Sequence, residues 1–587
     1  MEMLSSLGHC MPASGVALVV FEGLSLLIGA LEREYTEIVS VGVAARENGS
    51  PIEYMALQEL YPIGAIVTST SVGGLGGTLV ALRVDDCVYE PTRSLFGARK
   101  YSFRLILESV VAMAGDFVSV RFQHIFEEWT GTRELSHLPF KVFLRTGPTQ
   151  GSEILDAGSA AIYDMLLARA TALTALGGCT HAYRRHTAGA FFPSLHGSRN
   201  MGAASAADSQ ASAGRLIIDT KRGADLGYSP AAMTDDLGVA IAMETKRFRQ
   251  ITRSLKETNT EKERAERIQA GGMKIWQHVP DHLKLLCWPT VVAFSLTIKR
   301  WGFVLVDCID EVPRSDQAWE QLVLPPKTKE VLLAMAASTQ PATLAPPRYQ
   351  FHDVVEQRGR GVLFLLYGPP GTGKTLSVEA LAASFGRPLY TLSFAELGSS
   401  VAELEERLTD VLALSARWGA LVLLDEGDAL VERRKSGQLL LNSMTGVLLR
   451  LLETFDGALF ITSNRVSSFD PAALSRVTLA VRYDPLDTEA KKDVWRNSLA
   501  RLLQVERGNP RPRAEAVQKV NAEFNLNSLA QFTGSGRGVG AVIRLAVGLC
   551  QQRGVALSQE VLDDAIESWQ SFHADLRNEG VAESWEN

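Results

Sequence analysis

The chain has 587 residues, of which 46% are hydrophobic and 21% are charged, so it can build several folded domains and is not a disordered polymer. Its formal net charge of −7 excludes a protein whose overall field attracts nucleic acid or an anionic membrane. The six cysteines are scattered without a C-x-x-C pair, which is typical of buried thiols in a reducing compartment; we expect no disulfides and an intracellular location, cytoplasmic or nuclear.

The first part of the chain predicts a mixed, β-rich N-terminal region in which no catalytic constellation can be recognised. Residues 1–34 are apolar, but the run Gly15–Leu31 contains Glu22 and is shorter than the about 20 residues of a bilayer span. We expect a buried helix or a pair of strands there. Residues 35–199 predict a small β-rich domain with some helix at 104–114. The runs that predict strands include 38–43, 64–69 and 78–83.

Two features of the next stretch invite functional interpretations that the spacing does not favour. Cys179, His181, His186 and His196 match no zinc pattern, so we expect a loop without a metal. Residues 200–213 are small and polar, as in a flexible linker or insertion.

The second part of the N-terminal region is assigned to residues 214–338. Positive and negative side chains are interleaved over 244–269, which favours a solvated helix over a nucleic-acid patch. Two β runs within 291–307 predict a hairpin, and residues 318–337 predict a helix.

A linker with three prolines at 339–348 separates this region from a nucleotide-binding core at 349–484. Strand and helix patterns alternate through the core, which predicts an α/β fold with a parallel sheet and helices on both faces. Residues 485–587 predict a helical lid and a C-terminal tail.

The core opens with an apolar run that breaks into glycines and resumes as a helical pattern. The segment Gly368–Thr375 reads G-x-x-x-x-G-K-[ST], in which glycines let backbone N–H groups turn towards a phosphate. Lys374 is expected to reach the β- and γ-phosphates of ATP, and the Thr375 hydroxyl to hold Mg²⁺. The predicted nucleotide-binding residues of this segment are Gly368, Pro369, Pro370, Gly371, Thr372, Gly373, Lys374, Thr375 and Leu376.

Two later strands deliver polar side chains to the same predicted site. The apolar run 420–424 ends in Asp425 and Glu426, at the C-terminal edge of a buried strand. Asp425 is predicted to bind nucleotide-associated Mg²⁺, and Glu426 to polarise the water that attacks the γ-phosphate. The strand 458–463 delivers Asn464, whose neutral amide can orient that water without adding charge.

Together these motifs resemble the AAA+ ATPases, and they occur in the order of that family. The matching segments are Gly-Pro-Pro-Gly-Thr-Gly-Lys-Thr at 368–375, Leu-Val-Leu-Leu-Asp-Glu at 421–426 and Ile-Thr-Ser-Asn at 461–464. Residues 351–361, 417–426 and 462–470 further resemble a fungal-type group in which one ATPase module follows a poorly characterised N-terminal domain.

The resemblance implies a homo-oligomeric ring in which an arginine finger acts on the neighbouring subunit's ATP. The finger falls at Arg476, with Arg465 and Arg482 as nearby alternatives. Such a finger contributes about 10³ to 10⁵ in rate, so an isolated subunit is expected to be a poor ATPase. The resemblance also implies a sensor-2 arginine at Arg537. The implied adenine contacts are Asp353 and Val354.

The sequence departs from the family pattern at two places. The expected pore loop at 396–403 has no aromatic residue between Leu397 and Glu403, which puts threading by an aromatic grip in doubt. Gly427 stands where many members have alanine, at a helix-propensity cost of about 1 kcal/mol.

The leading hypothesis is a Mg²⁺-dependent ATPase that remodels an unidentified protein or complex. The alternatives are a nucleotide-gated scaffold with little turnover and a DNA-directed motor resembling a clamp loader. The acidic balance disfavours the second alternative, and no strong nucleic-acid or membrane signal is present.

Overall fold

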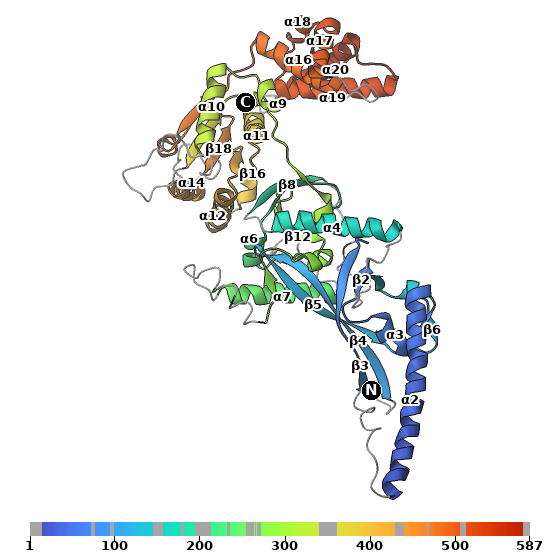
Figure 1. Cartoon of the computed structure of the whole chain (residues 1–587). Coiled ribbons are helices and arrows are strands. Elements are labelled where there is room, and N and C mark those ends of the chain that lie inside the picture. Colours follow the sequence, from blue (N-terminus) through green and yellow to red (C-terminus); the bar gives the residue numbers. More distant parts are fainter. Residues whose placement is uncertain are drawn as a thin grey trace. The chain divides into compact units, whose positions relative to one another are not determined.

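The computed structural model describes residues 15–71, 75, 77–93, 99–144, 157–177, 181–193, 213–231, 235–253, 263, 266, 272–339, 361–398, 400–428, 439–465, 469–504 and 512–578. The chain forms two compact units, Met1–Glu311 and Val312–Asn587 (Figure 1). None of the helices in these described ranges combines the length and the hydropathy that a bilayer span needs.

The N-terminal apolar run is part of a long helix, α2, which spans Gly15–Asn48. The strand predicted at 38–43 is therefore wrong. One face of α2 packs on the unit's core at a helical spacing, and this packing overrides the β propensity of the valines and isoleucine. Leu27 and Leu31 are 55% and 43% exposed, so the prediction that this part of the helix is buried is wrong. The residues of α2 that pack on the core are Ile38, Val41 and Ala45.

The first sheet of the N-terminal unit has six antiparallel strands in the order β11-β5-β4-β3-β2-β7. The strand β4 occupies residues 104–113, where a helix was predicted over 104–114, so that prediction is wrong. Near the end of β4, hydrophobic and polar residues do not alternate because both faces of the sheet are covered there. Val111 packs in one hydrophobic core and Val110 in another. The strands are β2 (Ile66–Ser69), β3 (Val80–Arg93), β4 (Arg99–Met113), β5 (Asp116–Glu127), β7 (Lys141–Leu144) and β11 (Ile275–Trp276).

The second sheet is also antiparallel, in the order β14-β8-β10-β12-β13-β9. The predicted hairpin is confirmed as β12 and β13, with Ser295 opposite Arg300 at its turn. The strands are β8 (Ala182–His186), β9 (Phe191–Pro193), β10 (Gly214–Ile218), β12 (Thr290–Ser295), β13 (Arg300–Leu305) and β14 (Ile309–Glu311). The remaining elements are β1 (Ile52–Glu53), α3 (Leu57–Leu60), β6 (Thr132–Arg133), α4 (Ala157–Gly177), α6 (Thr220–Leu226) and α7 (Asp236–Arg253).

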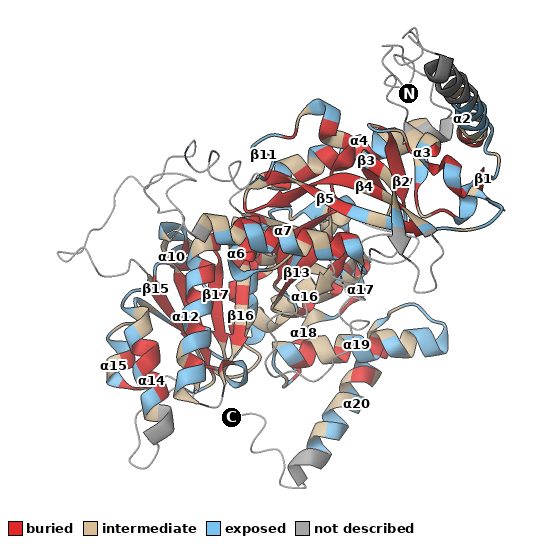
Figure 2. Cartoon of the chain, turned by 90° about the horizontal axis from the view of Figure 1, so that it is seen from below, coloured by how far each residue is buried: buried red, intermediate tan, exposed pale blue. Residues whose placement is uncertain are grey.

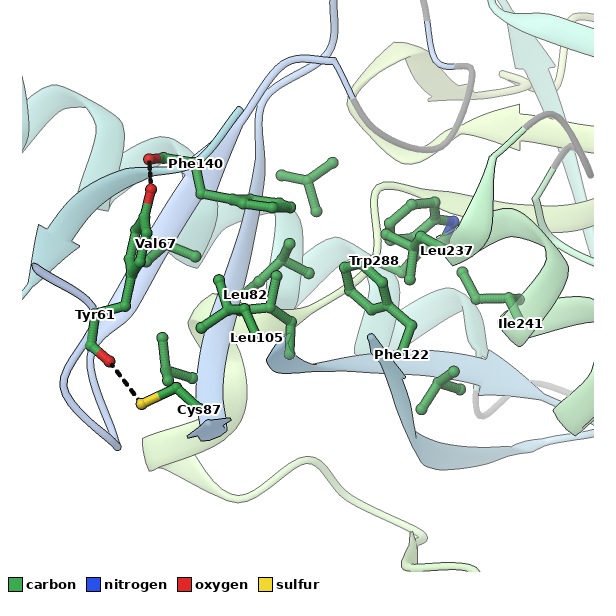
Figure 3. Close-up of a cluster of buried hydrophobic side chains, with 14 of the residues drawn as sticks. Tyr61, Val67, Leu82, Cys87, Leu105, Phe122, Phe140, Leu237, Ile241 and Trp288 are labelled. Carbon is green, nitrogen blue, oxygen red and sulfur yellow. Dashed lines mark hydrogen bonds between the residues drawn. The ribbon is translucent and has the colours of Figure 1, made fainter. Parts of the chain in front are cut away.

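The core below the first sheet is closed by buried aromatic side chains and a buried thiol. The Tyr61 hydroxyl donates a hydrogen bond of 2.8 Å to Phe140 O, and the Cys87 thiol lies 3.6 Å from Tyr61 O (Figure 3). Burial raises the pKa of Cys87 to about 11. The described cysteines are free thiols: Cys87, Cys287, Cys308 and Cys550.

The C-terminal unit contains the predicted α/β core. Its five strands are all parallel, in the order β16-β17-β18-β15-β19, and Figure 2 shows β15, β16 and β17 as largely buried. The strands are β15 (Val362–Tyr367), β16 (Leu389–Ser393), β17 (Leu421–Asp425), β18 (Ala458–Ser463) and β19 (Leu479–Arg482). The helices of the core are α11 (Lys374–Phe385), α12 (Val401–Trp418), α14 (Leu439–Leu452) and α15 (Pro471–Leu474).

The chain after β19 is helical, as predicted for a lid, and has its own hydrophobic core around Trp495 and Leu529. Its helices are α16 (Thr488–Gln504), α17 (Arg513–Glu523), α18 (Leu526–Leu529), α19 (Gly536–Arg553) and α20 (Gln559–Asn578).

Two helices upstream of the predicted linker belong to this C-terminal unit. They are α9 (Gln317–Gln321) and α10 (Pro326–Ser338), and they replace the single helix predicted at 318–337 because two prolines interrupt it. Trp319 and Leu332 pack in the same core as β15 and β18. The compact units therefore divide between Glu311 and Val312, upstream of the linker at 339–348.

Candidate functional site

The loop between β15 and α11 has the backbone shape that a phosphate cradle needs. Gly368, Gly371 and Gly373 have φ values of +145°, +75° and +96°, which favour glycine. A Cβ atom on Gly368 would lie 2.1 Å from Tyr483 O, so a side chain is excluded there. The positive φ values of the three residues and the lack of room for a Cβ atom at Gly368 therefore both favour glycine in this loop.

The ammonium group of Lys374 folds back on this loop. It donates hydrogen bonds of 2.8 Å to Gly368 O and 2.7 Å to Pro369 O, and the side chain is only 7% exposed. Burial lowers the pKa of Lys374 to about 8, while the nearby carboxylates Asp428 and Asp425 partly oppose this shift. The lysine is thus positioned at the loop with a charge that a bound phosphate would stabilise.

A carboxylate and two hydroxyl groups come together at the end of β17. The Thr375 hydroxyl donates a 3.0 Å hydrogen bond to Asp425 Oδ1, and the Thr462 hydroxyl at the end of β18 donates to the same oxygen. A hydroxyl and a carboxylate oxygen are ligands that Mg²⁺ prefers, and Mg²⁺ in nucleotide sites takes its other ligands from water and phosphate. Thr375 and Asp425 therefore fit a magnesium ion that accompanies a nucleotide.

Glu426 stands next to this group in an unusual conformation. Its φ of +53° lies in the left-handed region, which is uncommon for a residue other than glycine. The Glu426 N–H donates to the Thr462 hydroxyl at 3.0 Å, and this hydrogen bond holds the turn that leaves the carboxylate exposed. The predicted base is thus presented to solvent beside a fixed strand end.

Asn464 is held by a second strand-end contact. Asp428 accepts a 3.1 Å hydrogen bond from the Asn464 N–H and another from the Ser463 hydroxyl. The backbone of Asn464 is therefore fixed, and its half-buried side chain lines the same cavity as Glu426.

A cavity of about 500 Å³ connects these residues with the helical lid. Arg537 lines it, and the neighbouring Gly536 N–H donates a 3.1 Å hydrogen bond to Gly371 O, so α19 begins against the phosphate loop. Gly368 and Pro369 are not among the lining residues. The predicted site residues that line the cavity are Pro370, Gly371, Thr372, Gly373, Lys374, Thr375, Leu376, Asp425, Glu426, Asn464 and Arg537.

Other lining residues were not predicted. The end of α9 and one face of α16 form a wall of the cavity, and Asn497 Nδ2 donates 3.0 Å to Gln321 O between them. No motif marks this wall in the sequence, although a hydroxyl at the end of β18 could have pointed to Thr462. The unpredicted residues include Gln321, Leu322, Val323, Thr462, Val494, Asn497, Ser498 and Arg501.

The predicted finger, Arg476, is not brought into this cavity. It forms a 2.5 Å ion pair with Glu453 and donates 3.0 Å to Ala472 O. Of the two alternatives, Arg482 is paired with Asp484 at 2.8 Å and Arg465 is exposed. The predicted adenine contacts, Asp353 and Val354, lie outside the described residues.

The comparisons with known proteins match parts of the chain. The model of the family "ATPase family associated with various cellular activities (AAA)" matches residues 364–484. Protein SAV of Sulfolobus acidocaldarius is 32% identical over 185 residues, which are 29% of this chain and 21% of that protein.

Two further relatives match over similar lengths. Spastin of Drosophila persimilis is 32% identical over 158 residues, 25% of this chain and 19% of that protein. The 26S proteasome regulatory subunit 8 homolog of Schizosaccharomyces pombe is 30% identical over 145 residues, 22% of this chain and 36% of that protein. The chain thus spans between about a fifth and a third of the length of these relatives.

Proposed function

We propose that the chain hydrolyses ATP to remodel a protein or a complex, acting as a ring of copies, and that residues 364–484, which the AAA family model matches, are its ATPase module. One observation carries the proposal. Thr375, Asp425, Glu426 and Asn464 line one cavity beside a glycine-shaped phosphate loop, with the first two in hydrogen-bond contact. This is the set of groups that in-line attack of water on a γ-phosphate requires.

The loop supplies the binding energy for the phosphates. The Lys374 ammonium, which now donates to Gly368 O and Pro369 O, turns to the phosphate oxygens when ATP binds. The N-terminus of α11 adds a positive dipole end directly behind the loop. Because this lysine is buried, its charge acts on the phosphates in a medium of low dielectric constant.

Thr375 and Asp425 hold Mg²⁺ in this proposal. When bound, the ion neutralises charge on the β- and γ-phosphate oxygens. The Thr462 hydroxyl keeps Asp425 in place because it donates to the oxygen that Thr375 also contacts.

The chemical step is assigned to the ends of β17 and β18. The Glu426 carboxylate accepts a proton from water as the water oxygen bonds to the γ-phosphorus. The bond from that phosphorus to the bridging oxygen breaks, which leaves ADP and phosphate. Asn464 orients the water, and its neutral amide adds no charge beside the phosphate.

The site is completed by a neighbouring subunit in this proposal. Arg476 lies outside the cavity of its own chain and is one-third exposed, in an ion pair with a surface carboxylate. A pair of this kind is worth about 0 to 1 kcal/mol, so a γ-phosphate across a subunit boundary can compete for the arginine.

The variant Glu426→Gln tests the assignment of the base. It keeps the shape and exposure of the side chain but cannot accept the proton, so we expect ATP binding to be retained and steady-state turnover to fall about a hundredfold. ATP binding by fluorescence anisotropy and phosphate release measure the two effects separately. Equal turnover in the variant and the wild type would contradict the role of Glu426.

The same assay separates the alternative functions. A wild type that binds ATP but turns over no faster than Glu426→Gln would indicate a nucleotide-gated scaffold. Turnover that DNA stimulates would favour the clamp-loader-like motor. If turnover is confirmed, Glu426→Gln in ATP serves as a trap, and a pull-down with it identifies the partner that the ring holds.

A further inference from the structure

The register between β17 and β18 ends before the residues that are assigned to the chemical step. The last pair in this parallel register is Leu424 and Ile461. Glu426 follows that pair on one strand, and Asn464 follows it on the other. The regular spacing of the sheet therefore does not set the distance between the proposed base and the water-orienting amide, and contacts beyond the last pair must do so.

Backbone contacts beyond this pair hold the turn that follows β17. The Glu426 N–H donates 3.0 Å to Thr462 Oγ1, and the Gly427 N–H donates 3.0 Å to Thr462 O. Glu426 has its left-handed φ of +53° at the first of these residues. The base is therefore fixed relative to Thr462, but Asn464 lies two residues further along and is not held by these contacts.

The side chain of Asp428 reaches that part of the second strand. Its Oδ1 accepts a hydrogen bond from the Ser463 hydroxyl and one of 3.1 Å from the Asn464 N–H. Ser463 is only 1% exposed and is the last residue of β18, so it has little room to follow a displaced carboxylate. Because donors of two neighbouring residues converge on one oxygen, the length of the Asp428 side chain determines where the Asn464 backbone lies.

Asp428 is set back from the nucleotide site. The described residues that line the nucleotide cavity include Glu426 and Asn464 but not Asp428. In the proposed reaction one of the two lining residues accepts a proton from the attacking water and the other orients this water. The rate should therefore depend on how precisely they are placed, since a misplacement of about 1 Å can cost about a hundredfold.

We propose that Asp428 is a positioning residue that sets the distance between Glu426 and Asn464, and with it the place of the attacking water. It does so through the length of its side chain, which carries the Asn464 backbone, and not through its charge. This role rests on the proposed function and adds to it a residue that touches neither the nucleotide nor the water.

Two substitutions separate the length of the Asp428 side chain from its charge. Asp428→Asn keeps the length and an oxygen that accepts both hydrogen bonds, so we expect kcat to stay within about threefold of the wild type. Asp428→Glu keeps the charge but adds a C–C bond of about 1.5 Å, which displaces Asn464. We expect kcat to fall about tenfold or more while the dissociation constant of ATP changes by less than about threefold.

Phosphate release measures kcat for both variants, and an anisotropy titration measures ATP binding. The proposal is overturned if Asp428→Glu hydrolyses ATP as fast as the wild type, or if Asp428→Asn is as slow as Asp428→Glu. The second result would show that the charge of Asp428 matters more than its length.

Combination with Asn464→Ala tests the route of the effect. Without the amide there is no group left for Asp428 to position, so Asp428→Glu should lower the kcat of Asn464→Ala by less than about twofold. If the two reductions in kcat multiply instead, Asp428 acts on another group and the proposal is overturned.

Hydrogen exchange of the Asn464 amide tests the contact in the full chain without any turnover. Asp428→Ala removes the acceptor, so this part-buried N–H should exchange about tenfold faster or more, whereas in Asp428→Asn it should exchange as in the wild type. Equal exchange in the two variants would overturn the proposal even if the chain hydrolyses ATP. A wild type that hydrolyses no ATP would contradict the proposed function instead, and the exchange rates would still decide whether Asp428 holds Asn464.

Discussion

The side chains at the strand ends of the proposed nucleotide site and the proposed arginine finger are held in different ways. At the strand ends, Asp425, Thr462, Ser463 and Asp428 form hydrogen bonds to one another and to neighbouring backbone groups. The arginine assigned to act on the γ-phosphate, Arg476, is instead paired with a surface carboxylate, that of Glu453. The first set has few ways to move, and the second can exchange partners at small cost.

This difference separates the two tasks of the proposed site. Groups that fix the water and the metal ion gain from preorganisation, because any reorganisation during the reaction costs rate. A group that signals the presence of a neighbouring subunit must instead be free to leave its present partner. The exposed pair of Arg476 and Glu453 contributes little stability, which suits a residue with two alternative partners.

The largest expected effect comes from the exchangeable set. Arg476→Ala should lower turnover by about 10³-fold with little loss of ATP binding, since in this proposal Arg476 contacts only the neighbour's ATP. Mixing Arg476→Ala with Lys374→Ala subunits should restore part of the turnover, because some interfaces then combine an intact cavity with an intact finger. The measurement is phosphate release against the mixing ratio.

Glu453→Gln is the control for the partner of the finger. It weakens the ion pair in the isolated chain but leaves the arginine, so turnover in the assembled state should stay within about twofold of the wild type. Mixed subunits that co-assemble but recover no turnover would place the finger elsewhere, with Arg482 and Arg465 as the next candidates.

The next effect concerns the fixed set. Thr462→Val keeps the shape of the side chain but removes the hydroxyl that donates to Asp425 and accepts from the Glu426 N–H. We expect kcat to fall about tenfold or more while the dissociation constant of ATP changes much less, because the hydroxyl positions the base and the metal ligand. The part-buried N–H left without an acceptor should lower the free energy of unfolding by about 1 kcal/mol.

Thr462→Ser restores the hydroxyl and should recover most of kcat, which a loss of packing alone would not explain. If Val and Ser variants have the same kcat, Thr462 does not act through its hydroxyl.

The strand-end network also shows how far a sequence can be interpreted. Lys374 and Thr375 are contiguous with the glycines that shape their loop, and Asp425 and Glu426 end an apolar strand, so local patterns were enough to predict them. The parallel sheet and the helical lid were predicted for the same reason. No local pattern identifies Gln321, because its role arises only when distant segments pack together.

The N-terminal unit was less predictable because its pairings are long-range. In β4 the alternation of buried and exposed residues stops where two separate cores cover both faces, and this produced the mistaken helix at 104–114. In α2 a β-branched run is held as helix by packing along one face. Both errors come from tertiary contacts that outweigh local propensity.

A smaller effect is expected at Gly427, where many members of the family that the sequence resembles have alanine. A Cβ there would lie 2.7 Å from Ile461 Cγ2 and 3.3 Å from Leu424 Cδ2. The steric clash of the added methyl group therefore outweighs its gain in helix propensity. Gly427→Ala should lower the free energy of unfolding by about 1 to 3 kcal/mol. The matched control is Gly446→Ala in α14, where nothing lies within 4 Å and alanine should stabilise by up to about 1 kcal/mol. Equal changes in chemical denaturation would contradict the steric explanation.

The smallest effect is the pH dependence of ATP binding. Burial lowers the pKa of Lys374 from 10.5 to about 8 in the free chain, and bound phosphate favours the charged lysine and raises this pKa again. Above about pH 8 the free chain has lost the proton that the complex needs, so ATP affinity should fall with rising pH, by at most about tenfold per unit. The same shift makes the unfolded chain bind more protons than the folded chain between about pH 8 and 10.5, so stability from this group rises with pH while affinity falls. Anisotropy titrations between about pH 7.5 and 9.5 measure the affinity for ATP. The variant Lys374→Ala binds ATP weakly but lacks the titrating group, so its affinity should not change with pH. If the affinities of the variant and the wild type fall equally with pH, another group is responsible for the titration.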